Sequence, residues 1–232
     1  MESTDVLVIG SGIAGLCAAI EAARTGATVT VASAGKTMSG SSFFPGTWGL
    51  GLIGPVNEDD EQDLIDTILA VGGGVADPEL VQAFVHGIPQ AIDWLEQDLG
   101  VELQRPQSAK SAQQKQFIPC FDHKTRMWRG LTRKPLEDAL TTWIESLGIR
   151  LLPRHELIDL VEDTNGRITG TVLYDLTENR IVPLAAKATI IAAGGTGGLF
   201  ERSLTSADVL SSSQAIALAH GASLTNIAVS YT

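Results

Sequence analysis

Three glycines near the start of the chain, Gly10, Gly12 and Gly15, have the spacing G-x-G-x-x-G. They stand between a β-branched run, Val6–Ile9, which predicts a buried strand, and an alanine-rich segment, Ile13–Thr25, which predicts a helix. In that place the first glycine allows a tight turn, the second lets the backbone approach a pyrophosphate, and the third lets the helix pack on the strand. The helix N-terminus offers free N–H groups and a partial positive charge to phosphates. The pattern therefore predicts a dinucleotide-binding site.

The acidic residue that usually binds a ribose is missing from this pattern. It is expected about 20 residues beyond the glycines, at the tip of the second strand. The tip here is Ser33, after a predicted strand at Thr28–Val31, and Lys36 is the only cation close by. NAD normally gains a carboxylate at this point and NADP an arginine, so neither cofactor is favoured. FAD remains, because a long cofactor spreads its binding over many contacts and tolerates the loss of one.

Two later stretches carry a resemblance to a known family. They are GSSFFPGTWGLG, residues Gly40–Gly51, and TIIAAGGTGG, residues Thr189–Gly198. Together they resemble the fumarate reductase and succinate dehydrogenase flavoprotein superfamily, and within it the L-aspartate oxidase family most closely. Three more stretches are similar in the same order: ADPELVQAFVHGIPQAIDWLEQDLGVEL, ELIDLVED and SSSQAIALAHGASLTNI. The second strand of that superfamily also ends in Ser, which agrees with Ser33.

The resemblance implies a Rossmann-like FAD-binding fold and an FAD-dependent oxidoreductase. Its implied reaction is hydride transfer between flavin and a small dicarboxylic or amino acid, with L-aspartate to iminoaspartate as first choice, in NAD biosynthesis. A fumarate or other unsaturated-acid reductase is one alternative, and a non-catalytic FAD-binding fragment is another. Glycine pattern and resemblance together predict these FAD contacts: Gly10, Ser11, Gly12, Ile13, Ala14, Gly15, Ser33, Ala34, Ser41, Ser42, Phe43, Phe44, Glu156, Leu157, Ala193, Gly194, Gly195 and Ser213.

The chain departs from the family pattern at several places. Ser41 stands where some relatives carry the histidine that bonds covalently to flavin, so we expect non-covalent FAD. Ser213 stands where the family has Asp, with Gln214 in place of a glycine, and Pro45–Trp48 alters the loop expected to face the flavin ring. The family's capping domain, with its substrate-binding His and Arg, does not follow the final NIAVSYT. We therefore expect the N-terminal segment of a longer flavoprotein pattern, with a missing capping region or a homo-oligomer that covers an exposed apolar face.

The sequence assigns no catalytic residue. The basic segment HKTRMWRGLTRK, His123–Lys134, is a candidate for an anionic substrate or a flavin phosphate, but paired surface charges on an exposed loop and helix N-terminal region are the favoured interpretation. His86, His155 and His220 are interpreted as structural. Metal-ligating spacings such as C-x-x-C are absent, so no metal site is expected.

Composition limits the partners. The formal net charge of −11 argues against nucleic acid or an anionic membrane. No apolar run reaches the roughly 18 residues of a membrane span, and no signal peptide is apparent, so we expect a cytoplasmic protein. Only two cysteines, Cys17 and Cys120, are present, which gives no disulfide framework, and Cys17 is expected to be a core residue.

The elements that position these residues alternate between strand and helix. This order predicts an α/β fold: a mostly parallel central sheet, a small β-meander and added helices, in one FAD-binding domain over residues 1–232. The remaining helices are expected at Asp59–Val71, Pro78–Leu99, Pro135–Leu147 and Ser213–His220. The remaining strands are expected at Arg150–Leu152, Glu156–Val161, Ile168–Tyr174, Ile181–Leu184 and Thr189–Ala192, with loops at Gly35–Pro55 and Gln104–Gln116.

Overall fold

The computed structural model describes residues 2–44, 50–106, 124, 126–202 and 209–224. The chain forms two compact units, one made of Met1–Trp48 with Leu140–Thr232 and the other of Gly49–Ala139. The altered loop Pro45–Trp48, Cys120 and His123 lie outside the described residues, as does most of the loop expected at Gln104–Gln116.

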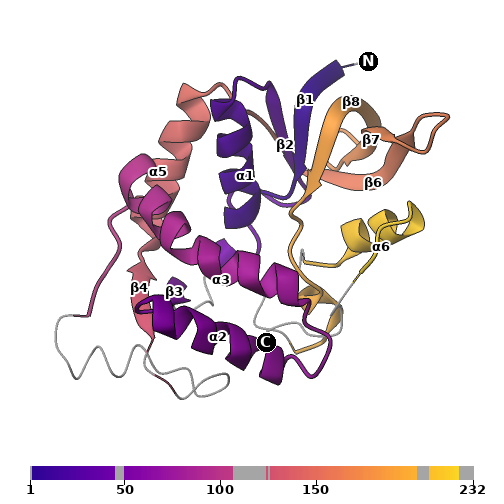
Figure 1. Ribbon diagram of the computed structural model, residues 1–232. Coiled ribbons are helices and arrows are strands. Elements are labelled where there is room, and N and C mark those ends of the chain that lie inside the picture. The colour runs from indigo at the N-terminus through magenta and orange to yellow at the C-terminus, as the bar shows by residue number, and fades with distance from the viewer. Residues whose placement is uncertain (1, 45–49, 107–123, 125, 203–208, 225–232) are drawn as a thin grey trace. The chain divides into compact units, whose positions relative to one another are not determined.

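A six-stranded mixed sheet forms the centre of the first unit (Figure 1). Its strands are β1 (Glu2–Ile9), β2 (Val29–Ser33), β5 (Arg150–Pro153), β6 (His155–Glu162), β7 (Ile168–Asp175) and β8 (Arg180–Ile191). The order across the sheet is β5-β2-β1-β8-β7-β6, with parallel pairing from β5 to β8 and antiparallel pairing from β8 to β6. The predicted α/β fold with a parallel centre and a β-meander is confirmed.

Strand β8 corrects one expectation. The sequence predicted two strands, Ile181–Leu184 and Thr189–Ala192, whereas the structure has one continuous strand of 12 residues. Its middle residues pair on both edges: Leu184 lies opposite Glu2 of β1 and opposite Thr171 of β7. Pairing with β7 as far as Ala185 and with β1 beyond it keeps the strand extended through a stretch, Ala185–Ala188, with weak strand propensity.

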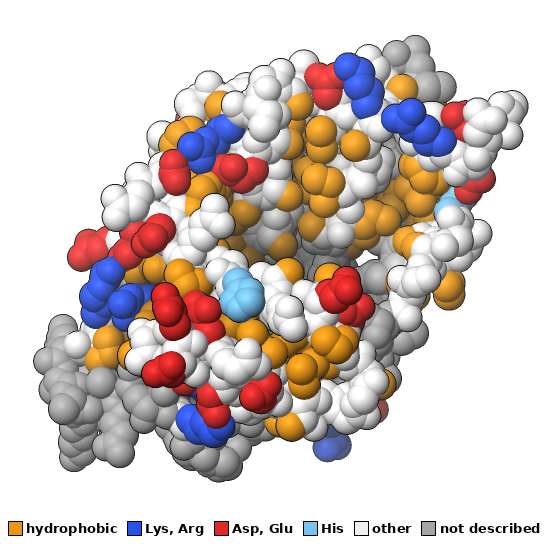
Figure 2. Space-filling view, in the orientation of Figure 1, with side chains coloured by type: hydrophobic (Ala, Val, Ile, Leu, Met, Phe, Trp, Pro, Cys, Tyr) orange, Lys and Arg blue, Asp and Glu red, His pale blue; other side chains and the backbone are white. Residues whose placement is uncertain are grey.

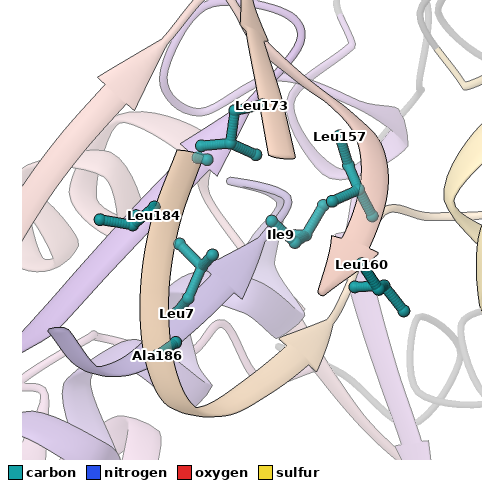
Figure 3. Close-up of a cluster of buried hydrophobic side chains, with 8 residues drawn as sticks. Leu7, Ile9, Leu157, Leu160, Leu173, Leu184 and Ala186 are labelled. Atoms are coloured by element: carbon teal, nitrogen blue, oxygen red, sulfur yellow. The ribbon is translucent and has the colours of Figure 1, made fainter. Parts of the chain in front are cut away.

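Two layers cover the centre of the sheet. Helix α1 (Ile13–Arg24) packs on β1 and β2, and its Leu16 and Ile20 have no exposed surface. On the other face, Leu7 and Ile9 of β1 point toward buried leucines of the meander (Figure 3). This cluster comprises Leu7, Ile9, Ala32, Leu157, Leu160, Leu173, Leu184 and Ala186. Alternate residues of β1 therefore serve two cores, as expected for a strand buried on both faces.

Helices dominate the second unit. It holds α2 (Glu58–Val71) and α3 (Pro78–Asp93), and a π-helical turn, η2 (Trp94–Asp98), directly continues α3. The Asn57 side chain caps α2, and Asp77 caps α3, with Pro78 in its first turn as predicted. Helix α3 continues through Pro89, and the predicted Pro78–Leu99 helix corresponds to α3 and η2 together. Acidic side chains gather over α2 (Figure 2).

The second unit also contains a two-stranded antiparallel sheet that the sequence did not predict. Strand β3 (Leu50–Gly54) lies in the segment expected to be a loop, and β4 (Met127–Leu131) lies inside the basic segment. The Trp128 indole explains the glycines here. A Cβ atom at position 51 would lie 2.9 Å from its Nε1, and one at position 130 would lie 2.4 Å from its Cη2. Glycine therefore leaves room for the ring.

Helix α5 (Arg133–Ser146) leads from the second unit back to the first, and α6 (Ser212–Ala219) follows β8. Two short 3₁₀ turns, η1 (Ser41–Phe43) and η3 (Gly197–Leu199), lie in the first unit. None of the helices in the described part of the chain is both long and apolar enough to cross a membrane.

Candidate functional site

A cavity of about 500 Å³ opens in the first unit, where β1, β2 and β8 end and α6 begins. Its walls come from four parts of the chain. They are Ile9–Ala14, Ser33–Gly35 with Ser39–Ser42, His155–Leu157, and Ile191–Gly194 with Val209–Gln214, Ala217 and Leu224. Carboxyl ends of parallel strands beside a helix N-terminus are the usual place for a ligand in an open α/β sheet.

The turn Gly10–Gly15, here the glycine turn, forms the floor of this cavity. A Cβ atom on Gly10, whose φ is +111°, would lie 2.2 Å from the Ala192 carbonyl oxygen. One on Gly15 would lie 2.0 Å from the Gly10 carbonyl oxygen. At Gly12, however, the nearest atoms would be Ser42 Oγ at 3.8 Å and Ser39 O at 3.9 Å. Gly10 and Gly15 are therefore required by the packing of the protein, whereas Gly12 borders open space.

The start of α1 offers hydrogen-bond donors to the cavity. The first backbone bond at this end runs from Leu16 N to Gly12 O at 3.0 Å, so the N–H groups of Ile13, Ala14 and Gly15 precede the helical ladder. Ile13 N makes only a long contact, 3.5 Å, to Ser42 Oγ. Gly10 N bonds to Ala32 O at 2.8 Å and Ala192 N to Ile9 O at 2.7 Å. The turn is thus held between β2 and β8, and the N–H groups of Ala14 and Gly15 have no hydrogen-bond partner among the described residues.

The tip of β2 carries no charge. Ser33 is 7% exposed, and its hydroxyl donates to Gly35 O at 3.3 Å, which leaves its lone pairs able to accept. Next to it the cavity wall continues with His155, Glu156 and Leu157 at the start of β6. His155 Nδ1 lies 2.9 Å from Pro153 O and Nε2 lies 3.7 Å from Asp175 Oδ2, so backbone and carboxylate together fix the ring.

The structure brings most of the predicted FAD contacts together. Of these residues, 14 line the cavity: Gly10, Ser11, Gly12, Ile13, Ala14, Ser33, Ala34, Ser41, Ser42, Glu156, Leu157, Ala193, Gly194 and Ser213. Gly15 lies beneath the turn, and Phe43, Phe44 and Gly195 are outside the lining. Phe43 is 8% exposed and so belongs to the core. Their role toward FAD stays a prediction.

Sequence reasoning missed several lining residues. Val209, Leu210, Ser211, Ser212, Gln214, Ala217 and Leu224 all come from the segment that holds α6. The sequence predicted only Ser213 there as a contact to FAD, and noted Gln214 only as a replacement for a glycine of the family. The available signal was the run of three serines before an apolar helix, which is typical of a helix N-terminus.

The cavity wall is nearly neutral. Among the described residues that line it, eight are serines, and only His155 and Glu156 have titratable side chains. The described part of the basic segment belongs to the second unit and is not among the described residues of this lining. Within this lining an anion would be held by backbone N–H groups and hydroxyls.

The basic segment forms ion pairs, as the favoured interpretation had it, but that interpretation was wrong in placing all of the charges on the surface, because Arg126 is buried. Arg126 is 1% exposed and binds Asp60 and Asp63, and Lys124 Nζ lies 2.6 Å from Asp63 Oδ1. These contacts, with hydrogen bonds from Lys124 first and Arg126 second, lower the pKa of Asp63. The expectation of a loop was wrong for Met127–Leu131, which forms β4. The Arg126 guanidinium is buried because two carboxylates of α2 neutralise it.

Cys17 and His220 are two of the titratable groups of the first unit whose pKa values are shifted. Burial raises the pKa of the Cys17 thiol to about 11, but the residue is half-buried and does not belong to the core as predicted. Hydrogen bonds to Glu162 and to Asp159, the latter at 2.9 Å, raise the pKa of His220. His220 thereby connects the end of α6 to β6. Within the described ranges no group of three or more His, Cys, Asp or Glu side chains could hold a metal ion.

These features fit a dinucleotide such as FAD. The backbone at Gly12 is open to the cavity, and the N–H donors at the start of α1 precede the first helical hydrogen bond. The segment Ala193–Gly195 after β8, the Gly194 corner, lies beside the glycine turn. No Ser–His–Asp arrangement is formed by the lining residues that the structure describes. The chemistry available from the wall itself is the binding and orientation of a ligand.

Comparisons with known proteins agree with this geometry. The FAD binding domain family matches residues 5–230. L-Aspartate oxidase of Halobacterium salinarum is 35% identical over 97% of this chain and 44% of its own length. The 8-methylmenaquinol:fumarate reductase flavoprotein subunit of Wolinella succinogenes is 31% identical over 86% of this chain and 32% of its own length. The chain thus spans less than half of these relatives.

Solved structures show the same fold. The open conformation of a flavocytochrome c3 fumarate reductase matches with a TM-score of 0.77 at 22% identity, over 97% of this chain and 41% of that one. A 3-ketosteroid dehydrogenase from Rhodococcus jostii matches with a TM-score of 0.75 at 21% identity, over 96% of this chain and 55% of that one.

Proposed function

The chain belongs to the FAD binding domain family of the fumarate reductase and L-aspartate oxidase type, and from this premise we propose that it binds FAD non-covalently for an oxidoreductase reaction. The observation that carries the proposal is the neutral cavity between the glycine turn and the Gly194 corner. Bound FAD would supply the capacity to accept or donate a hydride. The residues of this chain bind and orient it.

In this proposal each wall of the cavity has a separate task. The turn Gly10–Gly15 and the start of α1 hold the diphosphate, since their N–H groups face the cavity ahead of the first helical hydrogen bond. Ser33 accepts a ribose hydroxyl, and the backbone of Glu156 and Leu157 borders the adenine. Non-covalent binding follows from Ser41, because a serine cannot form the histidyl bond to flavin.

The proposed reaction is the oxidation of L-aspartate to iminoaspartate, in a cytoplasmic step of NAD biosynthesis. Its support is the similarity to L-aspartate oxidases from several organisms, among them Vibrio cholerae at 29% identity. A fumarate or other unsaturated-acid reductase is the second candidate, because a fumarate reductase flavoprotein is similar at 31% identity. In either case we propose that a capping region or a second copy of the chain completes the substrate site.

The experiment is a titration of the purified 232-residue chain with FAD, followed by flavin fluorescence and visible absorption. Saturable binding with a shifted flavin spectrum is the expected result. Release of all flavin on acid precipitation distinguishes non-covalent from covalent binding. A chain that is folded by circular dichroism and does not bind FAD contradicts the proposal.

A second assay separates the candidate reactions. Peroxide formed on addition of L-aspartate to the FAD-loaded chain supports the oxidase. Fumarate-dependent oxidation of a reduced viologen dye, without aspartate-dependent peroxide, supports the reductase. A loaded chain with neither activity supports the third possibility, an FAD-binding module that needs a capping region for turnover.

A further inference from the structure

Helix α6 packs against β6 but buries few of its side chains (Figure 1). Ser213 is the only one of its eight residues that is buried, Ile216 is partly buried against the hydrophobic cluster, and Leu218 is 55% exposed. Ala217 borders the cavity described above and also a second cavity of about 320 Å³ beside β8. A helix of this length has little stability of its own, so the position of α6 depends on its bonds to neighbouring segments.

These bonds lie at the two ends of the helix. At the start, the Ser211 hydroxyl donates to Gly195 O at 3.2 Å, and the Gln214 side-chain amide donates to Gly194 O. The groups in these two bonds carry no charge, so the bonds do not respond to pH. At the other end, the C-terminal capping residue His220 contacts two carboxylates of β6. The hold on α6 at this end therefore depends on titratable groups.

His220 bonds through both of its ring nitrogens. Nδ1 contacts Glu162 Oε1, and Nε2 lies 2.9 Å from Asp159 Oδ1. A neutral imidazole has a single N–H, so one ring lone pair would face a carboxylate oxygen, whereas the imidazolium donates to both carboxylates. The observed arrangement therefore fits the protonated ring.

The surroundings of His220 also favour its positive charge. The helix ends at this residue, and the partial negative charge of a helix C-terminus stabilises a cation. Glu162 and Asp159 of β6 face the ring, and the described residues of β7, β8 and α6 that line the second cavity include no other titratable side chain. Bonds to Glu162 and then to Asp159 raise the pKa of His220, and the same contact lowers the pKa of Asp159.

Strand β6 belongs to the FAD cavity as well, because His155–Leu157 at its start line the opposite side from Ser212–Gln214 of α6. His220 thus joins two segments of the cavity wall. We propose that His220 is a positioning residue for the cofactor: its imidazolium holds α6 on β6, and loss of its proton weakens FAD binding. This inference rests on the proposed function. By linkage, protonation of His220 and binding of FAD then favour one another.

The first test is the pH profile of FAD binding. From pH 6 to pH 9 the dissociation constant of the wild-type chain should rise roughly threefold to tenfold more than that of His220→Gln, since partly exposed charged contacts at a helix end contribute about this factor. His220→Lys keeps its charge over this range, so at pH 9 it should bind FAD more tightly than His220→Gln. His155 and Glu156 titrate in all of these proteins, so the difference between profiles reports on His220 alone.

His86→Gln is the matched control. His86 lies on α3 in the second unit, and its Nε2 is 3.9 Å from the Glu61 carboxylate, so this variant also removes an imidazole beside an acid. It should keep the pH profile of the wild-type chain. The same profile change in His86→Gln as in His220→Gln would contradict a specific role for His220.

Imidazole NMR of the wild-type chain is a second test that needs no variant. The pKa of His220 should be higher with FAD bound than without it. Parallel pH profiles for wild type and His220→Gln, or the same pKa of His220 with and without FAD, overturn the inference. A wild-type chain that binds no FAD at any pH overturns the proposed function itself, which distinguishes the two failures.

Discussion

Replacing Gly12 by Ala separates ligand binding from folding. Gly12 has φ of −72°, which any residue adopts, and its Cβ would have no neighbour closer than 3.8 Å. At an N-cap position, Ala is less stabilising than Gly by a fraction of a kcal/mol. Ala also reduces the conformational entropy of the unfolded chain, which stabilises the folded protein by about 0.4–1 kcal/mol. We therefore expect the free energy of unfolding to change by less than about 1 kcal/mol.

Binding of FAD should respond much more strongly to this change. The added methyl group occupies the space in which the backbone approaches the diphosphate, so the phosphates move away from the donors of α1. Loss of one charge-assisted hydrogen bond costs about 1.5–3 kcal/mol, which is a factor of roughly 10 to 150 in the dissociation constant. Flavin fluorescence titration measures this constant, and urea unfolding of the ligand-free chain measures stability.

Gly87→Ala is the matched control. Gly87 lies inside α3 in the second unit, and a Cβ there would meet nothing within 4 Å. Ala in a helix interior is more favourable than Gly, so this variant should gain about 0.5–1 kcal/mol in unfolding free energy and bind FAD like wild type. A folded Gly12→Ala variant with wild-type affinity would refute the reasoning, because the backbone at Gly12 would then not contact the ligand.

Three further predictions concern the first unit. Gly10→Ala places a Cβ 2.2 Å from the Ala192 carbonyl oxygen, at a φ of +111°. The free energy of unfolding should therefore fall by at least about 2 kcal/mol, measured as a lower urea midpoint. An unchanged midpoint would contradict this. Because no Lys or Arg is among the described residues of the cavity wall, raising NaCl from about 0.05 to 0.5 M should change the FAD dissociation constant less than about threefold, and a tenfold loss in titrations would show a cationic contact. Hydrogen bonds to Glu162 and Asp159 raise the pKa of His220 in the folded protein above its value in the unfolded chain, about 6.5. The stability that this contact adds is therefore complete below about pH 6.5 and is lost as the pH rises through the folded-state pKa. The difference in melting temperature between wild type and His220→Asn should therefore shrink from pH 6 to pH 9, and a constant difference would count against the contact.

The first βαβ unit could be predicted from the sequence because its signals are local. A β-branched strand, glycines at fixed spacing and an alanine-rich helix ending before Gly26 each specify their own conformation. The predicted helix Ile13–Thr25 differs from α1 by one residue. The glycine turn and Ser33 were accordingly placed at the cavity without knowledge of the rest of the sheet.

The long strand β8 and the pair β3–β4 could not be predicted in the same way. Ala185 in β8 has low strand propensity, and only its pairing with Ser3 and Gly170 on two edges keeps it extended. Gly51 and Gly130 read as loop residues, yet they are strand residues that leave space for the Trp128 indole. In each case contacts between distant segments override the local preference.

The lining residues from the segment that holds α6 show why part of the site could not be predicted from the sequence. Ser211–Gln214 follow the glycine turn by about two hundred residues, and no local pattern states that the two segments meet. They meet because β8 pairs with β1, which brings the Gly194 corner beside Gly10, and because Ser211 and Gln214 bond to that corner. A serine run is uninformative alone, since serines cap many helices. Its meaning comes from the opposite wall, where the N–H groups at the start of α1 precede the first helical hydrogen bond. The two helix starts therefore meet at one cavity only through the pairing of β1 with β8, which no local sequence pattern specifies.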